Sequence, residues 1–270
     1  MSTSEEKHID QDALLLSRSG KIIHQVWFAL SDKSDELYDK YASFRESWNR
    51  NEPEWYRMEW NEPFSKWLAK THFPEFFDTY MSYPYDIQRV DMIRYMALSR
   101  YGGWYADMDY YCNKPLQDAH RAFPHDFYLV ESPNVGGYVS NSLMYSTPNH
   151  VFWKRLLIAM EHYKNPPRYY SRHLVIMHTT GPSILTQVFN AYKARDRLNT
   201  LPAKLFHPTG ITTNITRLID HPDVYAFHAG HGTWEGVDSK LLVTVYRHKW
   251  LFLFILFIMS INYWSSPPPE

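Results

Sequence analysis

The sequence is poor in cysteine and carries no apolar segment near its start. Cys112 is the only cysteine among 270 residues. This excludes an intrachain disulfide and a cysteine-rich zinc site, and it suits a reducing compartment. The first twelve residues are polar and acidic, so we expect no secretory signal peptide there.

The sequence also lacks a charge excess of either sign and a phosphate-binding loop. Its 28 Lys and Arg side chains nearly balance 29 Asp and Glu side chains. No overall field therefore attracts nucleic acid or another polyanion, and we expect no nucleic-acid partner. No segment follows the Gly-rich P-loop pattern, which argues against phosphoryl transfer. The length suits one substantial α/β domain, or at most two small ones.

Aromatic side chains are abundant, at 17% of residues with 21 Tyr and 10 Trp. Two interpretations stay open at this point. Large rings can fill a core that is short of Leu and Val, or some of them can stack on a nucleobase or on the face of a sugar.

The last part of the chain contains one long apolar run, residues 250–264 (WLFLFILFIMSINYW), directly after Arg247, His248 and Lys249. As a helix, its 15 residues would extend about 22 Å, short of a hydrocarbon core of about 30 Å. We interpret residues 248–270 as an apolar tail that anchors the protein to a membrane or dips into it; a buried core helix is the alternative. The basic cluster would favour a cytosolic catalytic domain, but the orientation stays open.

The order of expected elements predicts an α/β fold with an open mixed sheet. Residues 1–19 are expected to be a flexible leader, and residues 34–80 helical and loop material. The expected strands are 21–28, 104–106, 127–131, 140–146 and 224–228, and the expected helices are 86–100, 151–163 and 182–193. Strands that alternate with helices indicate a single domain over residues 20–247.

Asp107 and Asp109 carry the clearest chemical signal. They follow a predicted strand, and residues two apart in an extended chain point to the same face. Paired carboxylates suit a hard divalent cation, which in turn binds phosphate. An isolated Asp-x-Asp is weak evidence, because such triplets also occur on solvated loops. Here Gly102 and Gly103 precede the pair and allow backbone to approach a ligand closely. Asp91 and Arg94, three apart, share one face of the preceding helix, although an internal ion pair would explain Arg94 equally well.

Three blocks of the sequence together resemble glycosyltransferase family 32. Residues 91–109 (DMIRYMALSRYGGWYADMD) resemble its DXD region, and residues 21–27 (KIIHQVW) resemble its opening strand. Residues 227–234 (FHAGHGTW) are similar to its closing His…Gly-Ser-Trp block, with Thr233 in place of Ser. The family includes inositol phosphorylceramide mannosyltransferases and other fungal and bacterial α-glycosyltransferases. The clear matches cover about residues 20–117 and 224–236.

The resemblance implies a GT-A fold, a nucleotide-sugar donor, and Mn²⁺ or Mg²⁺ as cofactor. It implies that Asp109 is a direct metal ligand, while Asp107 contacts the ribose or donor sugar and reaches the metal through water. His228 would complete the metal shell, with His231 as its competitor. The other implied site residues are Trp27 against the nucleobase (or else in the core), Gly103 close to the cofactor, Asp91 and Arg94 on hydroxyls of the donor sugar, Thr233 and Trp234 over the diphosphate, and Asn141 near the reacting centre.

By this resemblance the chain is expected to be a metal-dependent retaining glycosyltransferase that moves a hexose from a nucleotide-sugar to a lipid or glycan acceptor. GDP-mannose is the favoured donor, and no protein nucleophile can be named. The alternatives are a transferase that uses UDP-glucose or UDP-galactose to modify a protein or polysaccharide, and an inactive nucleotide-sugar-binding protein. The apolar tail favours an endomembrane location of the Golgi or ER type, with the cytoplasm as the alternative.

Overall fold

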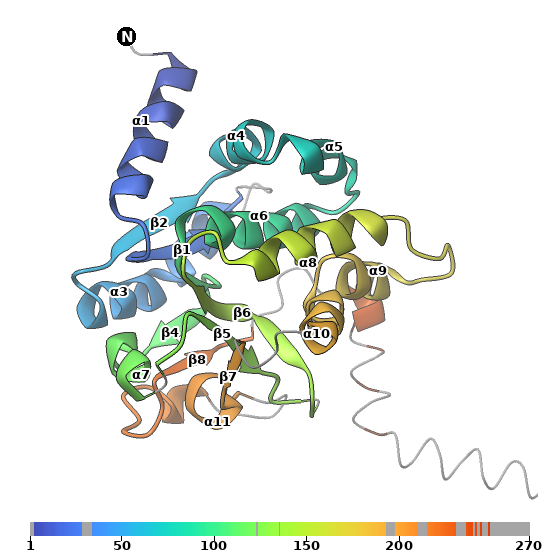
Figure 1. Cartoon of the computed structure of the whole chain (residues 1–270). Coiled ribbons are helices and arrows are strands. Elements are labelled where there is room, and N and C mark those ends of the chain that lie inside the picture. The colour runs from blue at the N-terminus through green and yellow to red at the C-terminus, as the bar shows by residue number, and fades with distance from the viewer. Residues whose placement is uncertain are drawn as a thin grey trace, which may run out of the picture.

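The computed structural model describes residues 3–28, 34–122, 124–134, 136–192, 198–209, 215–230 and 236–239, with single positions at 241, 244 and 248. A six-stranded sheet forms its centre, and a two-stranded sheet lies beside it (Figure 1). In spatial order the six strands are β2 (Tyr56–Trp60), β1 (Ile22–Val26), β3 (Gly103–Ala106), β6 (Val139–Ser146), β5 (Phe127–Glu131) and β7 (Asn199–Leu201). The small sheet pairs β4 (Tyr110–Cys112) with β8 (Ala226–His228).

The large sheet is mixed, as the sequence predicted. β1 runs parallel to both of its neighbours, β2 and β3, and β5 runs parallel to β7. Only β6 is antiparallel to the strands on either side of it. Parallel pairs need crossover connections, which here are helical, and the chain therefore folds as an α/β structure.

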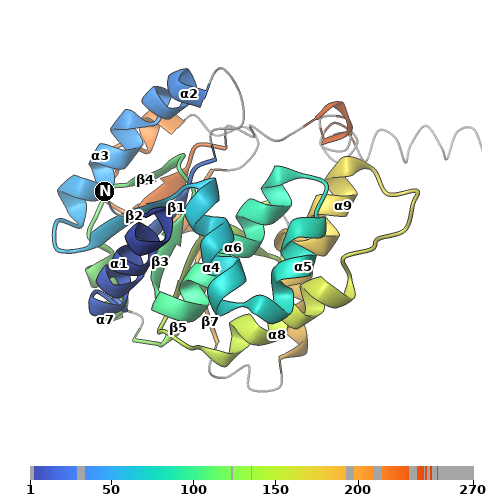
Figure 2. The same ribbon diagram turned by 90° about the horizontal axis from the view of Figure 1, so that it is seen from above.

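Helices cover both faces of this sheet, and the view from above shows the layer formed by α4, α5, α6 and α8 (Figure 2). On the opposite side lie α3, α7, α11 and the small sheet (Figure 1). The helices are α1 (Ser4–Ser17), α2 (Ser34–Lys40), α3 (Ala42–Asn51), α4 (Glu62–His72), α5 (Pro74–Ser82), α6 (Asp86–Tyr101), α7 (Leu116–Ala122), α8 (Val151–His162), α9 (Arg172–Thr179), α10 (Pro182–Ala191), α11 (Ala203–Phe206) and the short 3₁₀ helix Ile215–Arg217.

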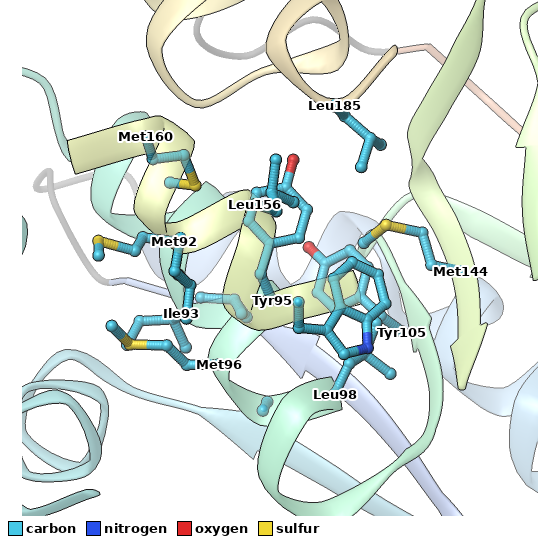
Figure 3. Packing of buried hydrophobic residues seen from close by; sticks show 14 of the residues in the cluster. Met92, Ile93, Tyr95, Met96, Leu98, Tyr105, Met144, Leu156, Met160 and Leu185 are labelled. Atoms are coloured by element: carbon cyan, nitrogen blue, oxygen red, sulfur yellow. The ribbon is translucent and has the colours of Figure 1, made fainter. Parts of the chain in front are cut away.

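The strands divide the core into two apolar clusters by simple alternation. On β5, Phe127 and Leu129 enter the cluster under α6 and α8, whereas Tyr128 and Val130 enter the cluster on the opposite face. Successive side chains of a strand point to opposite faces, so each central strand contributes to both clusters. Figure 3 shows the first cluster, in which side chains of α6 and α8 pack against β3 and β6. Most of the aromatic residues that the structure describes therefore fill the core.

A tight turn from α6 into β3 brings the acidic pair to the sheet edge. Gly102 ends α6 with φ +63°, and its N–H donates to the carbonyl of Leu98. At Gly103 (φ +97°) a Cβ would lie 2.2 Å from the carbonyl oxygen of Ile22. Gly103 stands at the start of β3, whereas Asp107 follows its end. The absence of a side chain at Gly103 therefore lets β3 approach β1 closely; the cofactor contact expected for this residue stays a prediction.

Two expectations about the first 80 residues were wrong. Residues 4–17 form a capped helix, α1, instead of a flexible leader. A capping box joins Thr3 to Glu6, Leu15 is fully buried, and Asp12 pairs with Arg100 of α6 at 2.8 Å. Residues 56–60 form the edge strand β2 in the stretch expected to hold only helices and loops. Pairing with β1 decided this, and such long-range pairing leaves little local signal.

The segment expected to anchor the protein, residues 250–264, lies outside the described residues. Of the helices that the structure does describe, none has the length and apolar character needed to cross a membrane.

Candidate active site

Two sheets meet at the acidic pair. Asp107 follows β3, and its N–H donates to the carbonyl of Ser142 on β6 at 2.9 Å. Asp109 precedes β4, whose Tyr110 lies opposite His228 in the register with β8. The N–H of Ala229 donates to the carbonyl of Asp109 at 2.9 Å. The antiparallel pairing of β4 and β8 thus sets the imidazole of His228, distant in sequence, beside both carboxylates.

These three side chains form a compact set of potential metal ligands. Nε2 of His228 lies 2.9 Å from Oδ1 of Asp109 and 3.5 Å from Oδ2 of Asp107. One ligand atom from each residue falls within 4.8 Å of the other two. Burial by itself would lower the pKa of His228, but Asp109 and Asp107 raise it to about 10. A proton on Nε2 of His228 offsets the repulsion between the carboxylates of Asp107 and Asp109. A divalent cation could take its place by binding both carboxylates.

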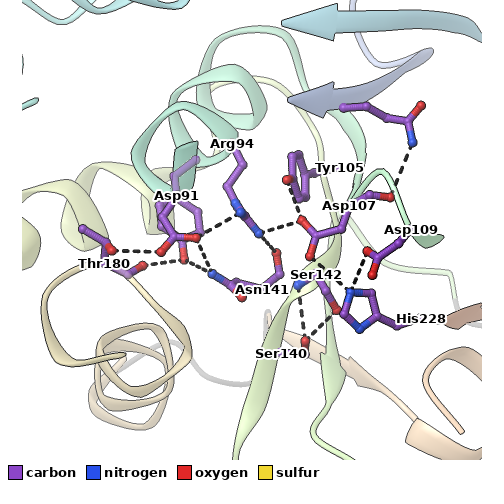
Figure 4. A network of polar contacts seen from close by, with 12 residues as sticks. Asp91, Arg94, Tyr105, Asp107, Asp109, Ser140, Asn141, Ser142, Thr180 and His228 are labelled. Atoms are coloured by element: carbon purple, nitrogen blue, oxygen red, sulfur yellow. Dashed lines mark hydrogen bonds and ion pairs between the residues drawn. The ribbon is translucent and has the colours of Figure 1, made fainter. Parts of the chain in front are cut away.

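Asp107 is held on its other side by a buried guanidinium. Nη1 of Arg94 donates to Oδ1 of Asp107 at 2.9 Å, and the hydroxyl of Tyr105 donates to the same oxygen at 2.7 Å. Nη2 of Arg94 lies 3.0 Å from Oδ1 of Asp91, one turn back along α6. The result is a row of charged side chains that runs from Asp91 to His228 (Figure 4). Arg94 is therefore an internal ion-pair partner of Asp91, and it also lies directly beside Asp107 of the acidic pair.

At the other end of this row, both carboxylate oxygens of Asp91 are paired within the protein. Nδ2 of Asn141 donates to Oδ1 of Asp91 at 3.0 Å, and the hydroxyl of Thr180 donates to its Oδ2 at 2.8 Å. The backbone carbonyl of Asn141 accepts from Arg94 at 2.9 Å. Burial raises the pKa of Asp91 to about 6, although Arg94 opposes the shift. Asn141 therefore lies within the polar network, where it fixes Asp91 and Arg94 relative to β6.

Trp27 lies just past the end of β1, half-buried and in contact with two tyrosine rings. Its ring centroid is 5.8 Å from that of Tyr38 and 6.1 Å from that of Tyr41. Tyr41 connects this aromatic group to the acidic pair, because burial and then the charges of Asp109 and Asp107 raise the pKa of its hydroxyl to about 12. The half-buried ring of Trp27 is compatible with stacking on a base as well as with packing.

Three of the expected site residues, His231, Thr233 and Trp234, lie outside the described residues. Conversely, the structure brings in residues that the sequence did not single out for the site. Tyr105 binds Asp107, Thr180 binds Asp91, and His207 packs beside His228. Tyr105 stands two before Asp107 on the same face of the strand, a spacing that could have indicated it. Thr180 and His207 are neighbours of the site only through the fold.

The donor set fits a hard divalent cation better than other ligands. Two carboxylates and one imidazole converge from the ends of three strands, and oxygen-rich sets of this kind suit Mg²⁺ or Mn²⁺. Their position at the carboxyl end of β3 is where open α/β sheets bind ligands. Such a cation would neutralise the acidic pair and leave part of its coordination sphere for a phosphate-bearing ligand.

Comparison with known families agrees with this geometry. Residues 38–126, which include the acidic pair, match the family described as glycosyltransferase sugar-binding region containing DXD motif. These residues belong to that family. The DXD motif itself is Asp107-Met108-Asp109. The resemblance inferred from the sequence is thereby confirmed.

This DXD glycosyltransferase region has well-matched relatives in yeasts. The mannosyl phosphorylinositol ceramide synthase SUR1 of Saccharomyces cerevisiae is 33% identical over 235 residues, covering 84% of this chain and 55% of the relative. The inositol phosphoceramide mannosyltransferase 3 of Schizosaccharomyces pombe is 28% identical over 243 residues, covering 88% of this chain and 62% of the relative. The chain thus spans a little over half the length of these two relatives.

Among solved structures, the PaToxG glycosyltransferase superposes with a TM-score of 0.46 at 14% identity, covering 69% of this chain and 76% of that one. The α/β class assigned here rests on the strand order of the chain itself.

Proposed function

We propose that this chain is a metal-dependent glycosyltransferase that moves a hexose from a nucleotide-sugar donor onto a lipid acceptor. The observation that carries the proposal is the convergence of Asp107, Asp109 and His228 at the carboxyl end of the sheet, within a DXD glycosyltransferase region. A GT-A type of nucleotide-binding fold is consistent with the mixed sheet.

We further propose mannose as the sugar, GDP-mannose as the donor and an inositol phosphorylceramide as the acceptor. The names of the two yeast relatives support this choice, since both describe mannosyl transfer to that class of lipid. UDP-glucose and UDP-galactose are the competing donors. We infer that transfer retains the α configuration, as the family resemblance implies.

We assign separate residues to the cation, the donor sugar and the nucleobase. Asp107, Asp109 and His228 would hold Mn²⁺ or Mg²⁺, which would offset the charge that develops on the departing nucleoside diphosphate. We assign the hydroxyls of the donor sugar to Asp91 and Arg94; Nε of Arg94 hydrogen-bonds no described residue. Trp27 would stack on the nucleobase, and Thr233 and Trp234 would close over the diphosphate. Asn141 and Tyr105 keep the charged row in place.

A donor screen tests the activity. GDP-mannose, UDP-glucose and UDP-galactose are each incubated with the protein, with Mn²⁺ or with a chelator, and release of the nucleoside diphosphate is measured. We expect release from GDP-mannose only with the metal, and faster release when phosphorylinositol ceramide is supplied in detergent micelles. Equal release with chelator would contradict the metal dependence, and release from a UDP-sugar alone would replace the donor.

We also propose that residues 250–264 attach the protein to an endomembrane. The motivation is the uncharged run bordered by Trp250 and Trp264, because aromatic residues concentrate at membrane interfaces. The full chain and a chain truncated after His248 are compared by flotation with liposomes. We expect the full chain alone to float and the truncated protein to stay folded and active. A full chain that stays at the bottom, or a truncated chain that does not fold, would make the segment part of the core.

A further inference from the structure

A second histidine lies against the potential metal ligand His228 without any hydrogen bond of its own. His207 directly follows α11, and its ring is buried between two others. Its ring centroid lies 5.3 Å from that of His228 and 6.0 Å from that of Tyr110. Neither Nδ1 nor Nε2 of His207 has a hydrogen-bond partner among the described residues.

Such an arrangement is costly unless a partner arrives. A buried polar group without a hydrogen bond destabilises the folded protein, because it has lost its contacts with water. His24 gives the usual arrangement: its Nε2 lies 2.9 Å from the carbonyl oxygen of Gly102, and its Nδ1 accepts from Trp60 at 3.1 Å. His207 therefore retains an acceptor nitrogen that the described residues leave unused, and it does so next to the site.

His228, in turn, needs a hydrogen-bond acceptor for Nδ1–H when a cation binds at its Nε2. Its Nε2 faces the two carboxylates, so Nε2 is the atom that would bind the metal, and the ring proton must then reside on Nδ1. Metal-bound histidines almost always donate this second N–H to an acceptor, which fixes the ring and makes it a better ligand. No described residue hydrogen-bonds Nδ1 of His228. Two imidazoles joined by an N–H···N bond have centroids about 5 Å apart, close to the 5.3 Å between His207 and His228.

We propose that His207 accepts a hydrogen bond from Nδ1–H of His228 in the metal-bound protein, and so is a positioning residue of the metal centre. This proposal rests on the proposed metal dependence. Rotation of the two rings would form this contact, and both rings also contact the ring of Tyr110. His207 would thus hold His228 toward Asp107 and Asp109 without touching cation or substrate.

Substitution at position 207 tests the acceptor separately from the packing. His207→Phe keeps an aromatic ring but has no acceptor, whereas His207→Asn and His207→Gln each offer an amide oxygen at a different reach. His120→Phe is the matched control, because His120 also lies among aromatic rings, 4.2 Å from the Tyr145 centroid, but in a separate part of the fold. Mn²⁺ affinity is measured by electron paramagnetic resonance of the free ion, with circular dichroism as the check on folding.

We expect His207→Phe to weaken Mn²⁺ binding about 10- to 100-fold, the usual cost of losing such a partner. His120→Phe should leave Mn²⁺ affinity within about twofold, and Asn or Gln at position 207 should restore most of it. Equal affinity in folded His207→Phe, or equal losses in all three variants at position 207, would overturn the inference. A wild-type protein that does not bind Mn²⁺ would instead overturn the proposed metal dependence.

The wild-type protein offers a direct second test should the Phe variant not fold. With ¹⁵N-labelled histidine and the diamagnetic ion Mg²⁺, a hydrogen bond between two imidazoles produces a ¹⁵N–¹⁵N coupling across the bond. We expect one such coupling to appear with Mg²⁺, and to disappear in His228→Ala. Its absence from the Mg²⁺-loaded protein would overturn the role of His207, whatever the variants do.

Discussion

The two ends of the charged row in the site differ in how completely they are paired. At the first end, Asp91 and Arg94 are each only 3% exposed, and Asn141 and Thr180 add hydrogen bonds to Asp91. At the second end, Nε2 of His228 lies 2.9 Å from Oδ1 of Asp109, and neither ring nitrogen of His207 hydrogen-bonds a described residue. The carboxylate of Asp91 is thus fully paired within the protein, while the second end places two carboxylates and an imidazole where a cation could bind.

This difference suggests a division of tasks within one network. A buried ion pair held by further hydrogen bonds is rigid, and removal of either partner is expensive. Two neighbouring carboxylates, in contrast, repel one another unless a proton or a metal lies between them. The buried end therefore fixes Asp107 through Arg94, and under the proposed function the open end would bind the cation.

The largest effect on stability is expected at the buried end. Arg94→Met leaves the charge of Asp91 uncompensated, which should lower the free energy of unfolding by about 3–5 kcal/mol at neutral pH. Urea denaturation measures this. Adding Asp91→Asn should recover part of the loss, because the double variant buries no unpaired charge. If the double variant were less stable than Arg94→Met alone, Asp91 would not be the source of the cost.

At the open end, Asp109→Asn should separate activity from stability. One anionic ligand is lost, so we expect turnover to fall by about 10²–10³-fold or more, while the free energy of unfolding changes by less than about 1 kcal/mol. Asp107→Asn should lower turnover similarly but should also destabilise the protein, since Asp107 is bound to Arg94. Wild-type rates for Asp109→Asn in Mn²⁺, with chelator controls, would contradict this assignment.

Substitution of Trp27 tests whether the proposed nucleotide-binding region extends to the end of β1. Trp27→Ala should weaken the binding of GDP by about 1–3 kcal/mol, the scale of a base–aromatic stack. Calorimetric titration measures it, and Trp67→Ala provides the control, since Trp67 is also half-buried but stacks on Phe64. Equal GDP affinity in the two variants would return Trp27 to a packing role.

Glu52, unlike Asp91, is a buried carboxyl that forms no ion pair with a described residue. Burial raises its pKa from 4.5 to about 7, and its carboxylate accepts from the N–H of Leu116 at the start of α7. A group whose pKa is higher in the folded protein stabilises it most when protonated. Its contribution is therefore full below about pH 4.5 and is lost as the pH rises through about 7.

Glu52→Gln should remove this dependence while keeping an acceptor for Leu116. Relative to the variant, the wild-type protein should lose about 1–2 kcal/mol of stability between about pH 5.5 and about pH 8. Urea denaturation at the two pH values measures the difference. Parallel stability curves for wild type and variant would mean that Glu52 keeps an ordinary pKa.

Much of the architecture could be predicted from local patterns. The apolar spacing and the glycine pair gave α6 and the turn into β3 almost to the residue, and the strand predicted at 127–131 is β5 with the observed bounds. The edge strand β2 and the helix α1 were not predicted. β2 depends on pairing with β1, and α1 depends on the burial of Leu15 and on the ion pair between Asp12 and Arg100. Interactions between distant residues leave no local period to recognise.

The sequence by itself determined which groups are candidates for the chemistry. It predicted that Asp107 and Asp109 face one site because alternate residues of a strand share a face, whereas in the structure a turn between β3 and β4 brings them together. Asp91 and Arg94 share a face because a helix brings residues three apart together. Only the tertiary structure decided how these pairs combine. It joined Arg94 to Asp107 across the turn, set His228 beside the acidic pair through the register of β4 and β8, and placed His207 behind it. It also placed Gly103 against Ile22 of β1, because the space around a residue is set by the strand that packs there.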